Sequence, residues 1–192
     1  MNLLIPIVAG LALAGANLGT PATPGAQPAG PQPAQEVRTA DVTTIDGVMT
    51  ALYESISGPA GQPRDWDRLR SLCRPDTRFV AARTLEDGRT AIFALSVDDF
   101  VMHNRKYFER GGYFETEVAR RAEEFGNIAH IWSTYESRRQ ADADPYLRGI
   151  YSVQLLKDKD RWWLISVYWD YEREDNPMPA KYLKSPDESS DQ

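Results

Sequence analysis

The chain has 192 residues and a mass of 21.6 kDa, with 42% hydrophobic and 26% charged residues, a composition typical of one globular domain with room for tails. Its 22 Lys and Arg against 28 Asp and Glu give a formal charge of -6, and no basic run is present, which argues against a nucleic-acid binder. One cysteine and two histidines exclude an intrachain disulfide, a zinc site built on several thiolates and a histidine-rich metal site.

An apolar run at the N-terminus predicts export. Leu3–Ala16 has the length of a signal-peptide core, and Ala14-Gly15-Ala16 fits a cleavage site with small residues at its first and third positions. The run is shorter than the ~20 apolar residues that span a bilayer. We therefore predict that residues 1–16 are a signal peptide and that the mature protein is periplasmic or secreted, without a stable membrane span. The alternative is an uncleaved N-terminus that tethers the protein to a membrane.

Two segments lack the large apolar residues that a core needs. Residues 17–40 are rich in Pro, Ala, Gly and Gln, whereas residues 176–192 combine prolines with an acidic end. We predict that both are disordered. This leaves residues 41–175 as one folded domain, which is long enough to bury a core without disulfides.

The first half of this domain predicts helices and one hairpin. Gly58-Pro59 ends the first helical pattern, and Asp87-Gly88 is a strong hairpin signal. Ser96 followed by Asp99 resembles a helix cap. In chain order, the patterns predict helices over Ile45–Ile56 and Trp66–Cys73, strands over Arg78–Leu85 and Arg89–Leu95, and a helix from Ser96 to Gly111.

The second half predicts strands throughout, dense in the aromatic and β-branched residues that suit a pleated surface. The expected strands are Phe114–Phe125, Ile128–Arg138, Tyr146–Lys157 and Arg161–Glu172. Because sequential strands usually pair, we predict an α+β fold: a curved antiparallel sheet of about six strands, with about three helices packed on its concave face.

Four stretches carry a family resemblance. They are PDTRFV at Pro75–Val80, FGNIAHIWSTYESR at Phe125–Arg138, RGIYSVQL at Arg148–Leu155 and RWWLIS at Arg161–Ser166. Together with the element order, they resemble uncharacterised bacterial members of the nuclear-transport-factor-2-like superfamily, which includes SnoaL-like and ketosteroid-isomerase-like cone folds. The resemblance implies a sheet curled around a pocket, often a dimer, and no cofactor. It does not imply a reaction, because the superfamily includes enzymes, ligand carriers and scaffolds.

One reaction of the superfamily is disfavoured by the residues present. The ketosteroid isomerases carry an acidic general base on the strand that corresponds roughly to Phe79–Arg83. Here that strand has Ala81 and Ala82 where the carboxylate is needed. Isomerase chemistry of that type is therefore not expected.

Register assigns side chains to the two faces of the sheet. Two-residue turns at Gly126-Asn127 and Asp158-Lys159 fix two hairpins, and pairing Glu136 with Arg148 joins them. Phe125 then lies opposite Ile128, and the further pairs are Arg121 with Trp132, Glu117 with Glu136, Gln154 with Trp163 and Ser152 with Ile165. One face, which we assign to the concave side, is apolar with scattered hydroxyls, as expected of a ligand pocket. From it we predict the ligand-binding residues Ser133, Tyr135, Tyr151, Trp162, Ser166 and Tyr168, with Val118 on the same face.

The leading hypothesis is an exported, cofactor-free protein that binds a small, mostly apolar ligand in the cone pocket. One alternative is a SnoaL-like enzyme that performs acid–base chemistry on a small carbonyl or ring compound, with His130, Glu136 or Asp170 as the acid or base. The other alternative is a dimeric interaction module. Its outer sheet face would form the homodimer contact, anchored by Trp132, Trp163 and Trp169.

Overall fold

The computed structural model describes residues 37–85 and 87–184. The predicted signal peptide, and the predicted spacer as far as residue 36, lie outside the described residues and stay predictions. Among the described residues, no helix is both long and apolar enough to cross a membrane. The helices are α1 (Thr39–Val42), α2 (Ile45–Ile56), α3 (Trp66–Leu72) and α4 (Val97–Gly111), followed near the C-terminus by the 3-10 helix η1 (Ala180–Tyr182).

The longer helices begin at side-chain caps. The Thr44 hydroxyl accepts a hydrogen bond from the Gly47 amide at 3.0 Å before α2, and Ser96 accepts one from the Asp99 amide at 3.1 Å before α4. Each cap satisfies a backbone donor that has no partner within its helix. The predicted cap at Ser96 is therefore confirmed.

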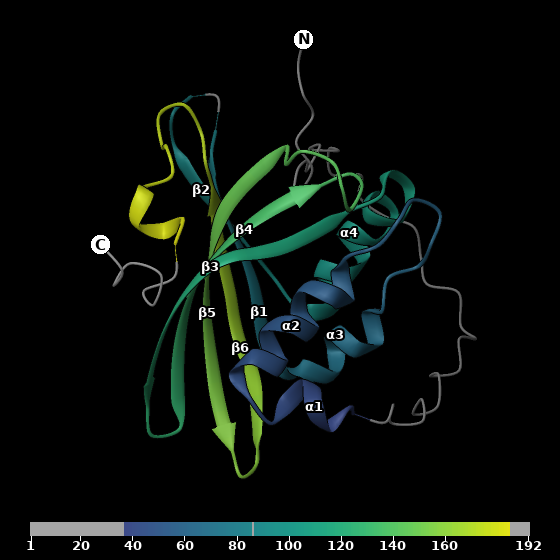
Figure 1. Ribbon diagram of the computed structural model, residues 1–192, viewed down its shortest axis with the longest axis vertical. Coiled ribbons are helices and arrows are strands. Elements are labelled where there is room, and N and C mark those ends of the chain that lie inside the picture. The colour runs from purple at the N-terminus through teal and green to yellow at the C-terminus, as the bar shows by residue number, and fades with distance from the viewer. Residues whose placement is uncertain (1–36, 86, 185–192) are drawn as a thin grey trace, which may run out of the picture.

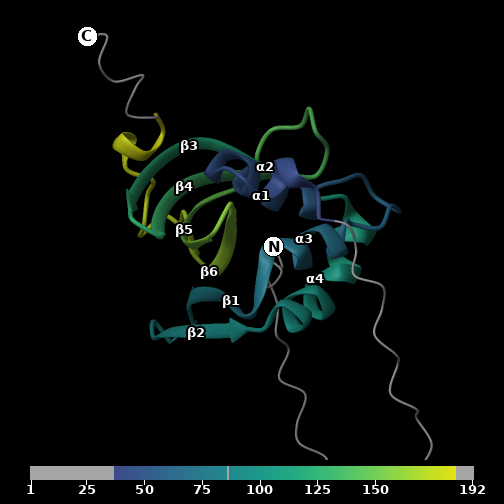
Figure 2. The same cartoon turned by 90° about the horizontal axis from the view of Figure 1, so that it is seen from below.

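Six strands form one sheet: β1 (Cys73–Thr84), β2 (Thr90–Leu95), β3 (Phe114–Phe125), β4 (Ile128–Arg138), β5 (Leu147–Asp158) and β6 (Arg161–Tyr171). Their order is β2-β1-β6-β5-β4-β3; β1 runs parallel to β6, and every other pair is antiparallel. The α+β fold class is confirmed. The sheet curls around helices α1 to α4, which cover one face, whereas η1 lies on the opposite side (Figures 1 and 2). We call the helix-covered side the inner face and the other side the outer face.

Two register shifts decide which residues share a face. In β3, Glu117 pairs with Tyr135 and Ala119 with Thr134, so Val118 is an extra residue. In β6, Ser166 pairs with Gln154 and Leu164 with Leu155, so Ile165 is extra in the same way. An extra residue in one strand exchanges the faces of the residues that follow it, which is the effect of a β-bulge.

The bulges correct several predicted pairs. Glu136 lies opposite Thr116 instead of Glu117, while Gln154 and Ser152 lie opposite Ser166 and Tyr168 instead of Trp163 and Ile165. The last turn is also shifted, since Asp158 pairs with Arg161 and encloses Lys159 and Asp160. The pairs Phe125–Ile128, Arg121–Trp132 and Glu136–Arg148, which no bulge affects, are confirmed.

Burial follows from these faces. Trp169, predicted for the outer face, lies in the core at 6% exposure, as does Val167 at 1%. Val118 and Tyr168, predicted for the concave face, are 39% and 43% exposed. Cys73 is buried, as expected of a structural thiol, and burial raises its pKa to about 12.

The C-terminal segment differs from its prediction. Residues 176–184, expected to be disordered, lie against the outer face. The Thr134 hydroxyl donates a hydrogen bond to the Tyr182 carbonyl at 2.6 Å, and Arg121 donates one to the Lys181 carbonyl at 3.1 Å. Backbone carbonyls bound by strand side chains hold this segment, so its low apolar content does not prevent order.

A buried arginine joins the loop after α2 to the end of α4. Arg64 is 5% exposed and donates hydrogen bonds to five backbone carbonyls, those of Ile56, Gly58, Pro59, Gln62 and Phe108. The guanidinium matches this role because its five N–H groups form a fixed, planar fork. Without it, the buried carbonyls of Ile56 and Phe108 lose a donor, each at a cost of about 1–3 kcal/mol.

We therefore predict that Arg64→Met lowers the free energy of unfolding by about 3 kcal/mol or more, measured by urea denaturation. The matched control is Arg105→Met on α4, because the Arg105 side chain is 59% exposed and pairs with Glu109 at the surface. That control should change the free energy of unfolding by less than about 0.5 kcal/mol. Equal effects of the two substitutions would contradict the role of Arg64.

Candidate functional site

A buried carboxyl group lies on the inner face near the start of the edge strand β3. Glu115 on β3 is 2% exposed, and its oxygens accept hydrogen bonds from Tyr151 Oη at 2.6 Å, from Ser137 Oγ at 2.9 Å and from Tyr113 Oη. Ser57, just after α2, bonds both the amide and the carbonyl of Glu115. Three hydroxyl donors thus surround one carboxyl group in a water-poor environment.

Burial and charge shift the pKa values of this cluster upward. Burial raises the pKa of Glu115, and the hydrogen bonds from Tyr113, Tyr151 and Ser137 oppose that rise without cancelling it. Burial, followed by the nearby Glu115 charge, raises the pKa of Tyr113 and Tyr151 well above the ordinary value. The surroundings therefore shift the titration of the carboxyl group and of the phenols towards higher pH.

A second polar chain runs beside the first. The Tyr53 and Ser133 hydroxyls are hydrogen-bonded at 2.7 Å, and Ser133 also donates to Glu117. Glu117 in turn accepts hydrogen bonds from Arg120. A groove of about 310 Å³ between α2 and β3 is lined by Tyr53, Glu115 and Glu117, among others.

The predicted inner-face residues are packed against one another. Tyr135 and Tyr151 stack with their ring centroids 4.4 Å apart, and Trp162 is 3% exposed in the same core. A Cβ at Gly149 would lie 2.4 Å from the Tyr135 hydroxyl, so only glycine leaves room for that ring. Ser133, Tyr135, Tyr151 and Trp162 do share the inner face, but they are core residues there.

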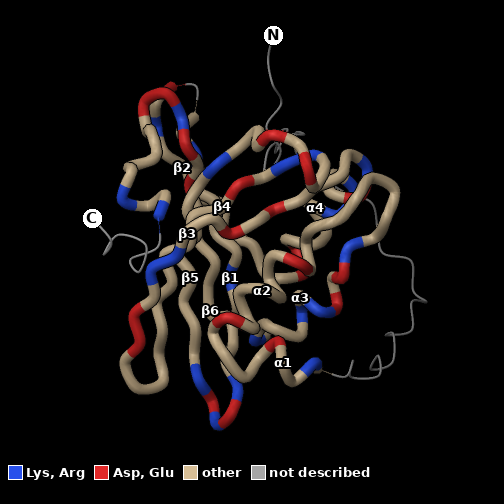
Figure 3. The backbone as a smooth tube through the Cα atoms, in the orientation of Figure 1, with Lys and Arg blue, Asp and Glu red and all other residues tan. Residues whose placement is uncertain are grey.

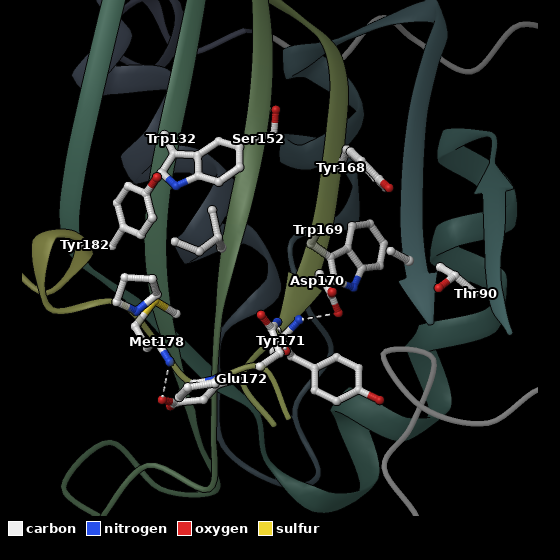
Figure 4. Close-up of a pocket in the computed structure, with 15 residues that line it drawn as sticks. Thr90, Trp132, Ser152, Tyr168, Trp169, Asp170, Tyr171, Glu172, Met178 and Tyr182 are labelled. Carbon is white, nitrogen blue, oxygen red and sulfur yellow. Dashed lines mark hydrogen bonds between the residues drawn. The ribbon is translucent and has the colours of Figure 1, made fainter. Parts of the chain in front are cut away.

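A pocket of about 500 Å³ lies on the outer face (Figure 4). Its floor is formed by neighbouring positions of three strands, since Trp132 pairs with Ser152, Ser152 with Tyr168, and Ile150 with Asp170. Its rim is the C-terminal segment, with Met178 and Tyr182 on the side of Trp132 (Figure 4). The further lining residues are Ala82, Thr90, Trp169, Tyr171, Glu172, Asn176, Pro177 and Pro179.

The two remaining residues of the predicted ligand-binding set, Ser166 and Tyr168, lie on the outer face. Tyr168 lines the pocket; Ser166, a partner of Gln154, lies on the same face outside it. The prediction that they share the concave face with Tyr135 is wrong, because the bulge at Ile165 turns both outward.

The candidate acid–base residues are also on the outer face, in separate environments. His130 Nε2 lies 3.1 Å from the Ser152 hydroxyl, and the ring stands edge-on to Trp132. Although burial raises the pKa of Glu136, hydrogen bonds from Arg148 and Arg138 hold it below its ordinary value. Asp170 pairs with Arg173 at 2.5 Å and lines the pocket. None of the three points into the cone.

Two parts of the arrangement were missed from the sequence. The sequence does not single out Glu115, because a register without a bulge places Glu117, its neighbour on the same face, on the outer side. A signal is nevertheless present, because Glu115 and Glu117 are two residues apart in the strand Phe114–Phe125 and so share one face. The pocket rim was missed because a Pro-rich segment was expected to be disordered.

Positive and negative side chains are interspersed along the described chain (Figure 3). Among the residues described, no group of three or more His, Cys, Asp and Glu side chains is placed to hold a metal ion.

A solved structure with a similar fold is known. A protein of unknown function with a cystatin-like fold from Nostoc punctiforme PCC 73102 matches with a TM-score of 0.52 and 13% identity, covering 68% of this chain and 90% of that one. The chain has the cystatin-like fold. This likeness describes the fold alone, because identity is so low.

Bacterial nuclear-transport-factor-2-like proteins of unknown function are also structural neighbours, as the motifs predicted. One from Silicibacter pomeroyi DSS-3 has a TM-score of 0.45 at 14% identity, covering 67% of this chain and 92% of that one. One from Methylobacillus flagellatus KT has a TM-score of 0.45 at 13% identity, with the same coverage of 67% and 92%. No family model matches the chain, and no curated protein does either.

The raised pKa of Glu115 predicts a particular dependence of stability on pH. A carboxyl group whose pKa rises on folding favours the folded state below its unfolded pKa, and this contribution is lost as pH rises through the folded value. The contribution of Glu115 to the free energy of unfolding should therefore decrease as pH rises above the ordinary value of 4.5. Glu115→Gln, which keeps the shape and cannot ionise, should lack this loss in denaturant titrations between about pH 4 and 8.

Glu124→Gln is the control, because Glu124 is an exposed acid on the same strand. It should follow the wild-type pH profile. Parallel profiles for Glu115→Gln and the wild type would show that Glu115 has the same pKa in the folded and unfolded chains.

Proposed function

We propose that this is an exported protein that binds a small, mostly apolar ligand in the outer-face pocket. The observation that carries the proposal is the pocket itself, whose volume of about 500 Å³ lies within the range of small-molecule sites. Trp132, Ile150, Met178 and Tyr182 supply apolar surface around it, and Ser152 and Asp170 supply a few polar groups. An apolar wall with few polar anchors is the usual composition of such sites.

The pocket is a better candidate than the inner face. Ser133, Tyr135 and Tyr151, which were expected to contact a ligand, are at most 7% exposed and occupied with one another or with Glu115 and Glu117. Opening the inner face would break those contacts. The outer pocket is available without any such change.

Filling the pocket tests this proposal. Ile150 is half-buried in the floor, so Ile150→Trp should occupy the pocket without disturbing the core. We expect it to weaken binding of the neutral, apolar dye Nile red, followed by its fluorescence, by about tenfold or more. Met102→Trp also introduces a tryptophan, at a site 67% exposed on α4, and should leave dye binding unchanged.

Nile red binding that both variants leave intact would place the dye elsewhere and contradict the proposal. Native mass spectrometry of gently purified protein gives an independent measurement. A bound mass of a few hundred daltons, absent from Ile150→Trp, would support the pocket and deliver its ligand for identification.

A row of four apolar side chains, two of them exposed, supports self-association as a second candidate function. Phe125, Ile128, Leu156 and Trp163 are successive partners across β3, β4, β5 and β6 and so form one row on the outer face. Phe125 is 83% exposed and Ile128 59%. A homodimer through the outer face would use this row, because Trp169 faces the core and Tyr182 lies beside Trp132.

We predict that the double substitution Phe125→Asp and Ile128→Asp converts a dimer to a monomer in sedimentation velocity, because two charges cannot be buried there without partners. Met102→Asp on α4, where the side chain is 67% exposed, should leave the dimer intact. A dimer that survives the double substitution would exclude the row as its interface, and a monomeric wild type would remove this second candidate.

A further inference from the structure

We propose that the ligand of the outer-face pocket is an organic ammonium ion: an apolar, aromatic-sized body that carries a protonated amine. This inference rests on the proposed function and specifies its ligand class. Asp170 is the group that receives the ammonium, and the aromatic side chains around it accept the body.

The charges among the lining residues have one sign. Asp170 and Glu172 line the pocket, and no lysine or arginine does. A carboxylate in a partly apolar pocket attracts a cation more strongly than it does in bulk water, because the local dielectric is lower. Arg173 pairs with Asp170 and Arg148 with Glu172, so these arginines offset much of the negative charge. The selection of a cation therefore rests on the Asp170 oxygen that Arg173 does not bind.

Asp170 has one oxygen available. Its Oδ1 accepts hydrogen bonds from the Tyr171 amide at 2.8 Å and from Arg173 at 2.5 Å. Its Oδ2 has no hydrogen-bond donor among the residues that the structure describes. Because the side chain is 40% exposed, a ligand amine can reach this oxygen. Arg173 fixes the carboxylate in place and leaves the second oxygen to the ligand.

Glu172, the second acidic residue of the pocket, has a different role from Asp170. One of its oxygens accepts a hydrogen bond from the Met178 amide at 2.8 Å, and the other lies 3.4 Å from Arg148 (Figure 4 shows the first contact). Both oxygens therefore have partners, and the first of them holds the pocket rim. Glu172 adds negative charge to the site and acts as a positioning residue.

The aromatic residues fit the same cation. Tyr168 lies one residue before Trp169 and two before Asp170 on β6, so it projects from the same face as Asp170. Trp132 and Tyr182 pack with their ring centroids 5.8 Å apart across the pocket's other side. The faces of such rings attract ammonium groups, by about 0.5–2 kcal/mol depending on desolvation. The ring surfaces also accept the apolar body of the ligand.

Three indole compounds of nearly equal size test the proposal: tryptamine, which is a cation at pH 7, tryptophol, which is neutral and also a hydrogen-bond donor, and indole-3-acetate, which is an anion. In calorimetric titrations at low salt, tryptamine should bind about tenfold more tightly than tryptophol, and indole-3-acetate should bind most weakly. The tryptamine advantage should shrink as salt is added.

Asp170→Asn removes the charge and preserves the shape, and it should bring tryptamine to within about twofold of tryptophol. Asp158→Asn makes the same change at an exposed acid at the end of β5, outside the pocket, and should retain the preference.

The outcomes separate the two proposals. Equal binding of tryptamine and tryptophol to the wild type, or a preference that Asp170→Asn leaves intact, overturns the ammonium inference while Nile red binding upholds the pocket. Failure of all three compounds, together with Nile red binding that is insensitive to Ile150→Trp, overturns the ammonium inference and the proposed function together.

Discussion

The structure depends on the alternation of side chains between the two faces of each β-strand. Two β-bulges, each of one extra residue, decide which side chains face the helices and which face outward. The extra residue at Ile165 turns Val167 and Trp169 toward the helices and Tyr168 and Asp170 away from them. The extra residue at Val118 places Glu117 on the inner face together with Glu115. The core and the outer pocket are therefore two results of the same local geometry.

The elements themselves could be predicted from the sequence. Phe114–Phe125 and Ile128–Arg138 have the predicted bounds, and so does the helix Ile45–Ile56, because period and turn signals are local. The parallel pairing of β1 with β6 joins segments about 90 residues apart, and no local signal specifies it.

The candidate site could be predicted only in part. Ser133, Tyr135 and Tyr151 were placed on the correct face, because the turn at Gly126-Asn127 sets the register of that hairpin. Beyond each bulge the sequence predicts the wrong face for the side chains. A one-residue insertion leaves no signal in the composition, yet it exchanges the faces of all the residues that follow it in the strand. The pocket rim failed for another reason: its order comes from Thr134 and Arg121 on distant strands.

Polar groups occur on both faces but serve different ends. On the inner face, both Glu115 oxygens accept hydrogen bonds from hydroxyl groups on three separate segments. These bonds form only when the segments have one particular arrangement. On the outer face, Asp170 retains an unused oxygen beside a cavity. A polar group whose hydrogen bonds are all made within the protein helps to specify the structure. A polar group with an unused acceptor beside a cavity can bind a ligand.

The parallel contact between β1 and β6 also sets the order in which the chain can fold during synthesis. Before β6 has been made, β1 has only β2 as a strand partner, and the apolar sides of α2 and α4 have no complete sheet to cover. Closing that long loop costs entropy before the contacts that repay it exist. The domain therefore completes its core late, after the ribosome has delivered Arg161–Tyr171, and the N-terminal half waits for a strand that lies at the middle of the sheet.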